Sequence, residues 1–219
     1  SASLVQTGAT ADAWLALLDS PRTHGAVRLK LPSWRMASYL DRGDLVKALE
    51  LLRKDGDGSQ GVPMSLIAAA RAGRHPDAAG AAELLTESVG RLVSAGKLRE
   101  LSVISLAPGA EPAGAGAMLF AAVRAAADAN RLKEAGKTAE ATAAWQRAAD
   151  ELAGALAPGA PPAVAAGARS LNGYVLRGAG RMPEAGEAFL AASREMQGER
   201  AADTRWMAVL CFDEASRKP

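Results

Sequence analysis

The sequence predicts an all-α protein, and three observations lead to this fold class. Of the 219 residues, 52 are alanine, whereas aromatic residues make up only 4%. Apolar content that comes from alanine suits closely packed helices better than β-sheets, which favour β-branched and aromatic residues. Prolines and glycines also stand where helices would begin and end. Together these patterns predict about eleven helices and no strand.

A repeated segment marks helix boundaries in the second half of the chain. Residues 106–110 read Leu-Ala-Pro-Gly-Ala, and the same five letters recur at 156–160. After each copy, an alanine-rich segment runs to a glycine that a basic residue follows, at Gly136 and at Gly180, and a second segment comes next. Proline near the start of a helix and glycine after its end are the expected signals. Each copy is therefore predicted to form a helical hairpin.

The same residue intervals recur in the two hairpins. The second copy contains Gly173, Leu176, Gly180, Ala185 and Phe189, and the first copy keeps these intervals with the residues Ala129, Leu132, Gly136, Ala141 and Trp145. This spacing resembles that of the tetratricopeptide repeat (TPR) family. Small residues allow two antiparallel helices to approach closely, and the turn glycine adopts a conformation that other residues resist. The large residue, Phe or Trp, is expected to fill the space against the next helix.

The sequence departs from the family pattern at two points. The usual tryptophan and tyrosine of the first helix are missing, and the turn glycines Gly136 and Gly180 lie 44 residues apart, where the family period is about 34. The resemblance implies a right-handed α-solenoid of stacked antiparallel helix pairs.

Four segments follow one another under this interpretation. They are an N-terminal flanking helix and loop (1–31), divergent TPR-like pairs (32–105), two clearer pairs (106–198) and a C-terminal capping helix (199–219). Turns are expected at Gly43, Gly73 and Gly96. Trp14 and Trp206 are expected to anchor the two flanking helices, whose outer faces should be more polar, because the ends of a repeat stack meet water.

Residues that could carry metal or thiol chemistry are few. His24 and His75 lie in a loop and a turn without a partner at helical spacing, so the sequence predicts no metal site. Residues 55–61 have some likeness to a calcium loop, but they lack its sixth-position glycine and twelfth-position glutamate. Cys211, the single cysteine, lies in an apolar run and is expected in the core, with a cysteine-linked dimer as the alternative.

No motif indicates a cofactor or a catalytic residue. The glycines near 114–116 follow no expected strand, and no Gly-Lys-Ser/Thr occurs, so nucleotide binding has no support. Arg42, Gly43 and Asp44 spell an adhesion tripeptide, but they stand at an expected turn, and chance explains so short a match.

The stacked hairpins that the resemblance implies would form a concave face, lined mainly by the first helix of each pair. Asparagine can hold a peptide backbone because its amide both donates and accepts, and arginine suits a carboxylate. The candidate partner-binding residues are Arg124, Asp128, Asn130, Arg131, Arg169, Asn172, Tyr174 and Arg177. For each, the alternative is a solvated helix face. A chaperone-type clamp is not expected, because Ala126, Ser170 and Tyr174 stand where the family has lysine or arginine.

The sequence therefore predicts a non-catalytic scaffold that binds a peptide or helix of a partner protein. A first alternative is an interaction domain of a larger enzyme or envelope-anchored protein whose activity lies elsewhere. A second is an enzyme that uses Asp41, Asp44 and Glu50, which is disfavoured because no base or metal pairs with these carboxylates.

Charge and hydropathy bear on partners and on location. The net charge of +2 gives no reason to expect nucleic acid. The most apolar stretch, 113–123, is about half as long as a membrane span requires. Formation of a homo-oligomer stays open. So does the compartment, cytoplasm or cell envelope, because the chain begins at Ser1 without a signal peptide and removal of a leader or anchor is compatible with that start.

Overall fold

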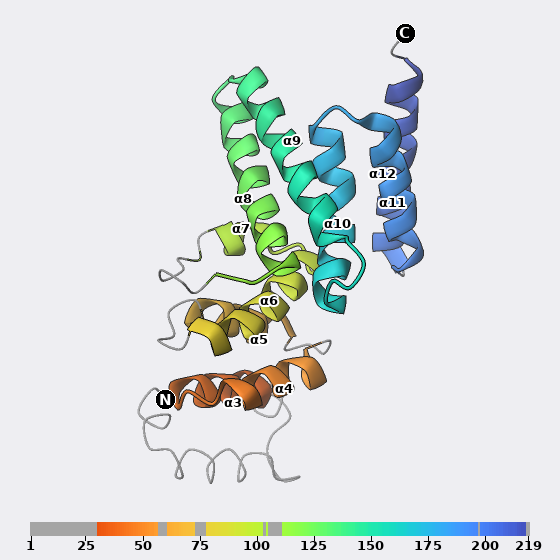
Figure 1. Ribbon diagram of the computed structural model, residues 1–219. Helices are drawn as coiled ribbons and strands as arrows, with labels where there is room; N and C mark the ends of the chain where they lie inside the picture. The colour runs from red at the N-terminus through yellow and green to blue at the C-terminus, as the bar shows by residue number, and fades with distance from the viewer. Residues whose placement is uncertain are drawn as a thin grey trace. The chain divides into compact units, whose positions relative to one another are not determined.

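The computed structural model describes residues 30–56, 61–72, 78–102, 104, 111–196 and 198–217 (Figure 1). Within these ranges the chain forms ten α-helices and no strand, which confirms the all-α prediction. The helix expected before residue 30 with its Trp14, the turn at Gly73, His24 and His75 lie outside the described residues. The total of about eleven helices stays a prediction.

The ten helices of the described residues follow one another along the chain. In chain order they are α3 (Leu31–Asp41), α4 (Leu45–Asp55), α5 (Gly61–Ala72), α6 (Ala78–Ser94), α7 (Leu98–Ser102), α8 (Ala115–Glu134), α9 (Thr138–Ala155), α10 (Pro162–Gly178), α11 (Met182–Arg194) and α12 (Gly198–Ser216). They form two compact units. The first comprises residues 1–92 and 103–113, and the second comprises residues 93–102 and 114–219. None of the helices in the described ranges has the length and hydropathy that crossing a membrane requires.

Three hairpins, α3/α4, α8/α9 and α10/α11, share one turn. Gly43, Gly136 and Gly180 have φ angles of 72°, 74° and 79°, the left-handed region that favours glycine. The residue after each glycine donates its backbone N–H to a carbonyl five residues earlier. These bonds are Asp44 to Tyr39 (2.8 Å), Lys137 to Leu132 (2.9 Å) and Arg181 to Leu176 (2.9 Å). This is the longer bond of a Schellman turn, and it confirms the expected turns at these glycines.

The chain leaves each of these turns in the same way. Asp44, Lys137 and Arg181 have φ between −84° and −87° and ψ between 65° and 70° before the next helix begins. Each then accepts a backbone hydrogen bond from an alanine four residues later, and all three alanines are buried. These alanines are Ala48, Ala141 and Ala185. The alanine of the sequence pattern is thus a buried position in the first turn of the second helix.

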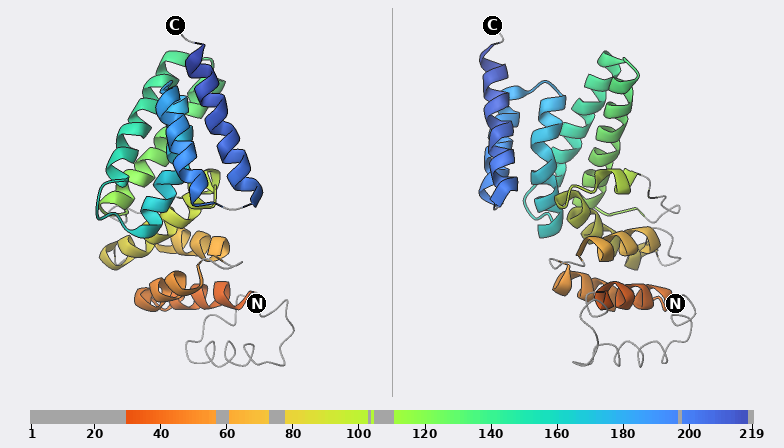
Figure 2. Two further views of the ribbon diagram at one scale, coloured as in Figure 1. Left: turned by 90° about the vertical axis from the view of Figure 1, so that its right-hand side faces the viewer. Right: turned by 180° about the vertical axis from the view of Figure 1, so that it is seen from behind.

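Helices of the second unit pack in chain order. α8 contacts α9, α9 contacts α10, α10 contacts α11 and α11 contacts α12, and the right-hand view of Figure 2 shows this succession. α8 also contacts α10, and the short α7 contacts α8. Neighbours in the sequence are therefore neighbours in space.

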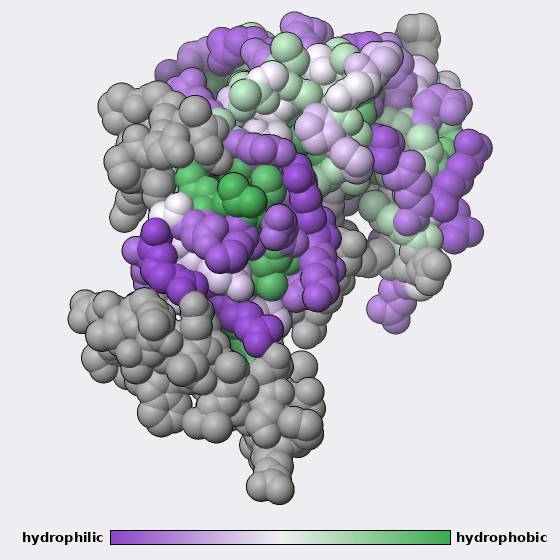
Figure 3. All heavy atoms as spheres, turned by 60° about the horizontal axis from the view of Figure 1, so that its bottom comes forward, coloured by the Kyte–Doolittle hydropathy of each residue, from purple (hydrophilic) through white to green (hydrophobic). Residues whose placement is uncertain are grey.

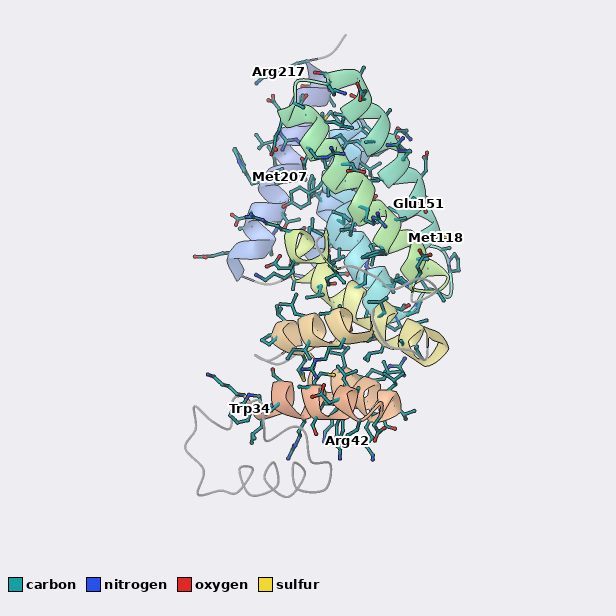
Figure 4. The ribbon with its side chains drawn as sticks, turned by 90° about the vertical axis from the view of Figure 1, so that its left-hand side faces the viewer. Trp34, Arg42, Met118, Glu151, Met207 and Arg217 are labelled. Carbon is teal, nitrogen blue, oxygen red and sulfur yellow. The ribbon has the colours of Figure 1, made fainter. Side chains whose placement is uncertain are left out.

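Glycines bring these helices close together, as the small-residue spacing predicted. A Cβ atom added to Gly178 would lie 2.4 Å from the indole of Trp145, so Trp145 of α9 packs on the next helix as expected. Phe189 of α11 differs: it packs against Gly173 of α10, the helix before it. Met118 of α8 lies against α9 in the same manner, near Glu151 in Figure 4.

The last helix corrects one prediction. Trp206 was expected to anchor α12, but its side chain is 60% exposed, and Val209 beside it on the outer face is exposed as well. α12 instead buries a stripe of small residues, Ala201, Ala208 and Cys211. The helical period places residue 206 opposite this stripe, so the position of the tryptophan outweighs its hydrophobicity. The outer face is consequently less polar than expected.

The first unit contains a small core with ion pairs around it. α3 packs against α4 and α5, and Trp34 and Arg42 mark the two ends of α3 in Figure 4. Glu87 of α6 is buried, and its carboxylate accepts from Arg91 at 2.8 Å. Arg53 of α4 reaches Glu83 of α6 at 2.7 Å. On the face drawn in Figure 3, hydrophilic residues surround smaller hydrophobic areas, as expected for amphipathic helices.

Candidate functional site

A groove of about 1240 Å³ lies within the second unit. Residues of α8, α9 and α10 form most of its walls, and Leu98 and Arg99 of α7, Met182 of α11 and Glu214 of α12 complete them. We call this hollow the α8/α10 groove. The groove is therefore lined by both α8 and α10, each of which is the first helix of a repeated hairpin.

The floor of the α8/α10 groove is apolar and partly aromatic. Val123 and Leu171 are buried beneath it. The indole of Trp145 is half-buried and lines the groove, and its contact with the backbone of Gly178 holds the ring in place. Tyr174 is 51% exposed, and its ring is nearly perpendicular to that of Phe189, at 87° with 4.9 Å between centroids. Two aromatic rings are thus presented to the groove, each braced by a neighbour.

The rim of the groove is polar and carries more cations than anions. Arg131 of α8 donates to Asp128 at 3.1 Å, an exposed pair worth less than about 1 kcal/mol. Lys133 of α8 and half-buried Arg177 of α10 have no ion pair within the described residues. Asn130 adds an exposed amide that can both donate and accept.

Four of the eight candidate residues line this one groove. These are Asn130, Arg131, Tyr174 and Arg177. The other four lie outside its lining. Arg124 is exposed on α8, Asp128 pairs with Arg131, half-buried Arg169 donates to Glu195 at 3.0 Å, and Asn172 is half-buried.

Several groove residues were not anticipated from the sequence, above all Trp145, Lys133 and Met182. Trp145 was assigned to packing alone, because the repeat interval gives it the same place as Phe189 and both were expected to fill the space against the next helix. The signal that could have found it is Gly178. A glycine late in the neighbouring helix leaves room for an indole to lie over its backbone and still reach the open side.

A second hollow of about 220 Å³ lies beside α10 and is lined in part by Ser170, Met196, Asp203 and Thr204. Two of its hydroxyl groups have partners inside the fold. Ser170 donates to the carbonyl of Gly167 at 2.8 Å, and Thr204 contacts the sulfur of Met196 at 3.4 Å. This hollow is smaller than most ligand sites.

The remaining candidate chemistry belongs to the fold. Asp41 pairs with Arg71, and Asp44 caps α4 and pairs with Lys47, while Glu50 is exposed on α4. Cys211 is buried, as expected, and this burial raises the pKa of its thiol. Within the described residues, no three His, Cys, Asp or Glu side chains gather as a metal site would require. Most of the calcium-like stretch, residues 57–60, lies outside those ranges.

Comparison with known proteins adds no assignment: no protein family, curated protein or solved structure matches this chain.

Proposed function

We propose that the protein is a non-catalytic, TPR-like interaction scaffold that binds a segment of a partner protein in the α8/α10 groove. The repeated turn geometry of α3/α4, α8/α9 and α10/α11 supports a helical array of the TPR kind. The chain-order packing of α8 to α12 supports it too. In such an array, a right-handed solenoid, first helices line the concave face.

One observation carries the proposal. Residues chosen from the sequence for binding lie on two different helices, and four of them line one hollow that also holds Trp145. A braced aromatic floor with a polar rim suits a peptide, because apolar anchors provide affinity and the rim amides and cations select among sequences. Exposed aromatic rings fixed by their neighbours also lose little entropy on binding.

The proposal can be tested with a phage-displayed library of random peptides about twelve residues long, selected on the purified protein. Enriched peptides are then measured by fluorescence anisotropy against Tyr174→Ala and against Val209→Ala. Both side chains are about half exposed, but only Tyr174 lines the groove. We expect Tyr174→Ala to weaken binding about tenfold and Val209→Ala to leave it unchanged.

The two variants must melt within a few degrees of the parent for the comparison to hold, because Tyr174 contacts Phe189. A library that yields no binder, or binders that lose equal affinity in both variants, would reject the groove as a peptide site.

A further inference from the structure

We propose that the segment bound in the α8/α10 groove is acidic: an amphipathic stretch that sets apolar side chains against Trp145 and Tyr174 and carboxylates against Lys133 and Arg177. This inference rests on the proposed peptide-binding function and adds the chemistry of the partner.

The groove's own charges point to an anionic occupant. Its lining includes the four cations Arg99, Arg131, Lys133 and Arg177 and the two anions Glu134 and Glu214. Arg131 pairs with Asp128 outside the lining, which leaves an excess of one cation. The whole chain has a net charge of only +2, so this excess is local to the groove. A preference for acidic segments would therefore come from contacts inside the groove and not from long-range steering by the whole protein.

Arg177 carries most of this argument. It is half-buried on α10, and within the described residues no carboxylate forms an ion pair with it. A guanidinium that is partly withdrawn from water and lacks a counter-ion gains more from a new carboxylate than an exposed one does. The planar fork of arginine also matches two carboxylate oxygens at once.

Lys133 provides a second contact of the same sign on the facing helix, α8. A segment lying in the groove would therefore meet cations from both walls, while its apolar side chains rest on the aromatic floor between α9 and α10. A basic segment would instead place like charges beside Lys133 and Arg177, which costs affinity. The cations of the two walls thus favour an acidic segment, and the aromatic floor favours a segment with apolar side chains.

A charge-reversal pair tests the inference. Lys133→Glu/Arg177→Glu changes two groove residues, and Arg124→Glu/Arg147→Glu changes two exposed residues outside the lining. The formal change of charge is the same in both variants. We expect library peptides enriched on the parent to be net acidic and to bind the groove variant about tenfold or more weakly. Binding to the control variant should change less than about twofold.

The same library selected again on Lys133→Glu/Arg177→Glu should now yield net basic peptides. If either reversal variant fails to fold, the neutral pair Lys133→Gln/Arg177→Gln and its control Arg124→Gln/Arg147→Gln replace them, with the same expected order of affinities.

The failures are distinguishable. Peptides that depend on Tyr174 but are neutral or basic would overturn the acidic preference and leave the proposed function standing. Equal weakening in the groove and control variants would also overturn it, because the effect would then be one of overall charge. An absence of any peptide that depends on Tyr174 would reject the proposed function itself.

Discussion

The hairpins α8/α9 and α10/α11 have the same turn and the same residue intervals, yet they use their large aromatic residue differently. Phe189 is 1% exposed and packs on Gly173 of the preceding helix. Trp145, at the equivalent position, is half-buried, packs on Gly178 of the following helix and lines the groove. The repeat interval therefore places a residue on its helix, and the glycine of a neighbouring helix decides whether it is buried in the core or lines the groove.

The largest expected effect separates these two aromatic positions. Phe189→Ala removes a fully buried ring and should reduce the free energy of unfolding by about 3–5 kcal/mol. Trp145→Ala removes a ring that water already reaches and should cost about half as much. Urea denaturation followed by circular dichroism measures both. Equal losses would show that Trp145 is a core residue like Phe189, and that the contrast between the hairpins is only apparent.

A smaller difference is expected among the glycines on which these rings rest. In Gly173→Ala the new Cβ would lie 2.6 Å from the ring of Phe189, which has no free space to move into. Overpacking of this kind costs about 1–3 kcal/mol, from which the better helix propensity of alanine subtracts up to about 1 kcal/mol. A net loss of stability in thermal unfolding is the expected result.

Gly154→Ala is the matched control for that substitution. Its new Cβ would meet the sulfur of Met118, whose flexible side chain is 40% exposed and can swing aside. Stability should therefore stay unchanged or rise by up to about 0.5 kcal/mol. A destabilisation as large as that of Gly173→Ala would mean that α8 and α9 are packed as tightly as α10 and α11.

The turns between helices could be predicted from the sequence, but the neighbours that each large side chain packs against could not. The turns at Gly43, Gly96, Gly136 and Gly180 followed from glycine spacing, because a positive φ is a local requirement. Half of the candidate binding residues line one groove. Tyr174 and Arg177 share a face of α10 because they are three residues apart. On α8, however, Arg124 lies on the same face as Arg131 by helical period and is still outside the lining, so the period alone does not select the groove residues. Which neighbouring helix a large side chain packs against, the preceding or the following one, depends on where that helix has a small residue, and no local interval encodes that.

Trp206 and Trp145 are two tryptophans whose surroundings were not predicted correctly from the sequence. Trp206 was taken for an anchor because it is large and apolar, but α12 packs through small residues on its other face. Trp145 was taken for packing alone, and it lines the groove. In an alanine-rich chain, helices approach closely through small residues, so a large side chain is buried only where a small residue of the neighbouring helix leaves room for it, as Gly173 does for Phe189.

The shared turn gives a third, smaller prediction, in which the two hairpins should behave alike. Gly136→Ala and Gly180→Ala each force alanine into φ above 70°, and within the described residues no atom lies within 4 Å of the added Cβ. The cost is then one of backbone alone, about 1–2 kcal/mol at either site. Differential scanning calorimetry should give equal shifts, and Asn at these positions should cost less. Unequal shifts would show that the two turns differ beyond their backbone angles.

The smallest effect concerns the third hairpin with this turn, α3/α4. Asp44 follows its glycine, and its carboxylate accepts from the backbone N–H of Lys47 at 3.3 Å and lies 2.9 Å from the Lys47 ammonium. The hydrogen bond with the Lys47 side chain is the main reason that the pKa of Asp44 falls below its usual value. Because the folded protein holds this proton less tightly than the unfolded chain, Asp44 adds stability above the unfolded pKa. That stability is lost as the pH falls through the folded pKa.

Asp44→Asn isolates this charge, because asparagine still caps the helix. At about pH 6 the variant should be less stable than the parent by no more than about 0.5 kcal/mol, since the pair is partly exposed, and at about pH 2 the difference should vanish. Asp44→Ala should lose the cap as well, about 0.5–1 kcal/mol, at both pH values.

In α9 and α11 the equivalent residues are Lys137 and Arg181, which form no side-chain cap within the described part of the chain. Their side chains form exposed ion pairs with Glu140 and Glu184, and such pairs contribute little, so alanine there should leave stability nearly unchanged. A cost as large as that of Asp44→Ala would mean that these pairs contribute as much as a helix cap.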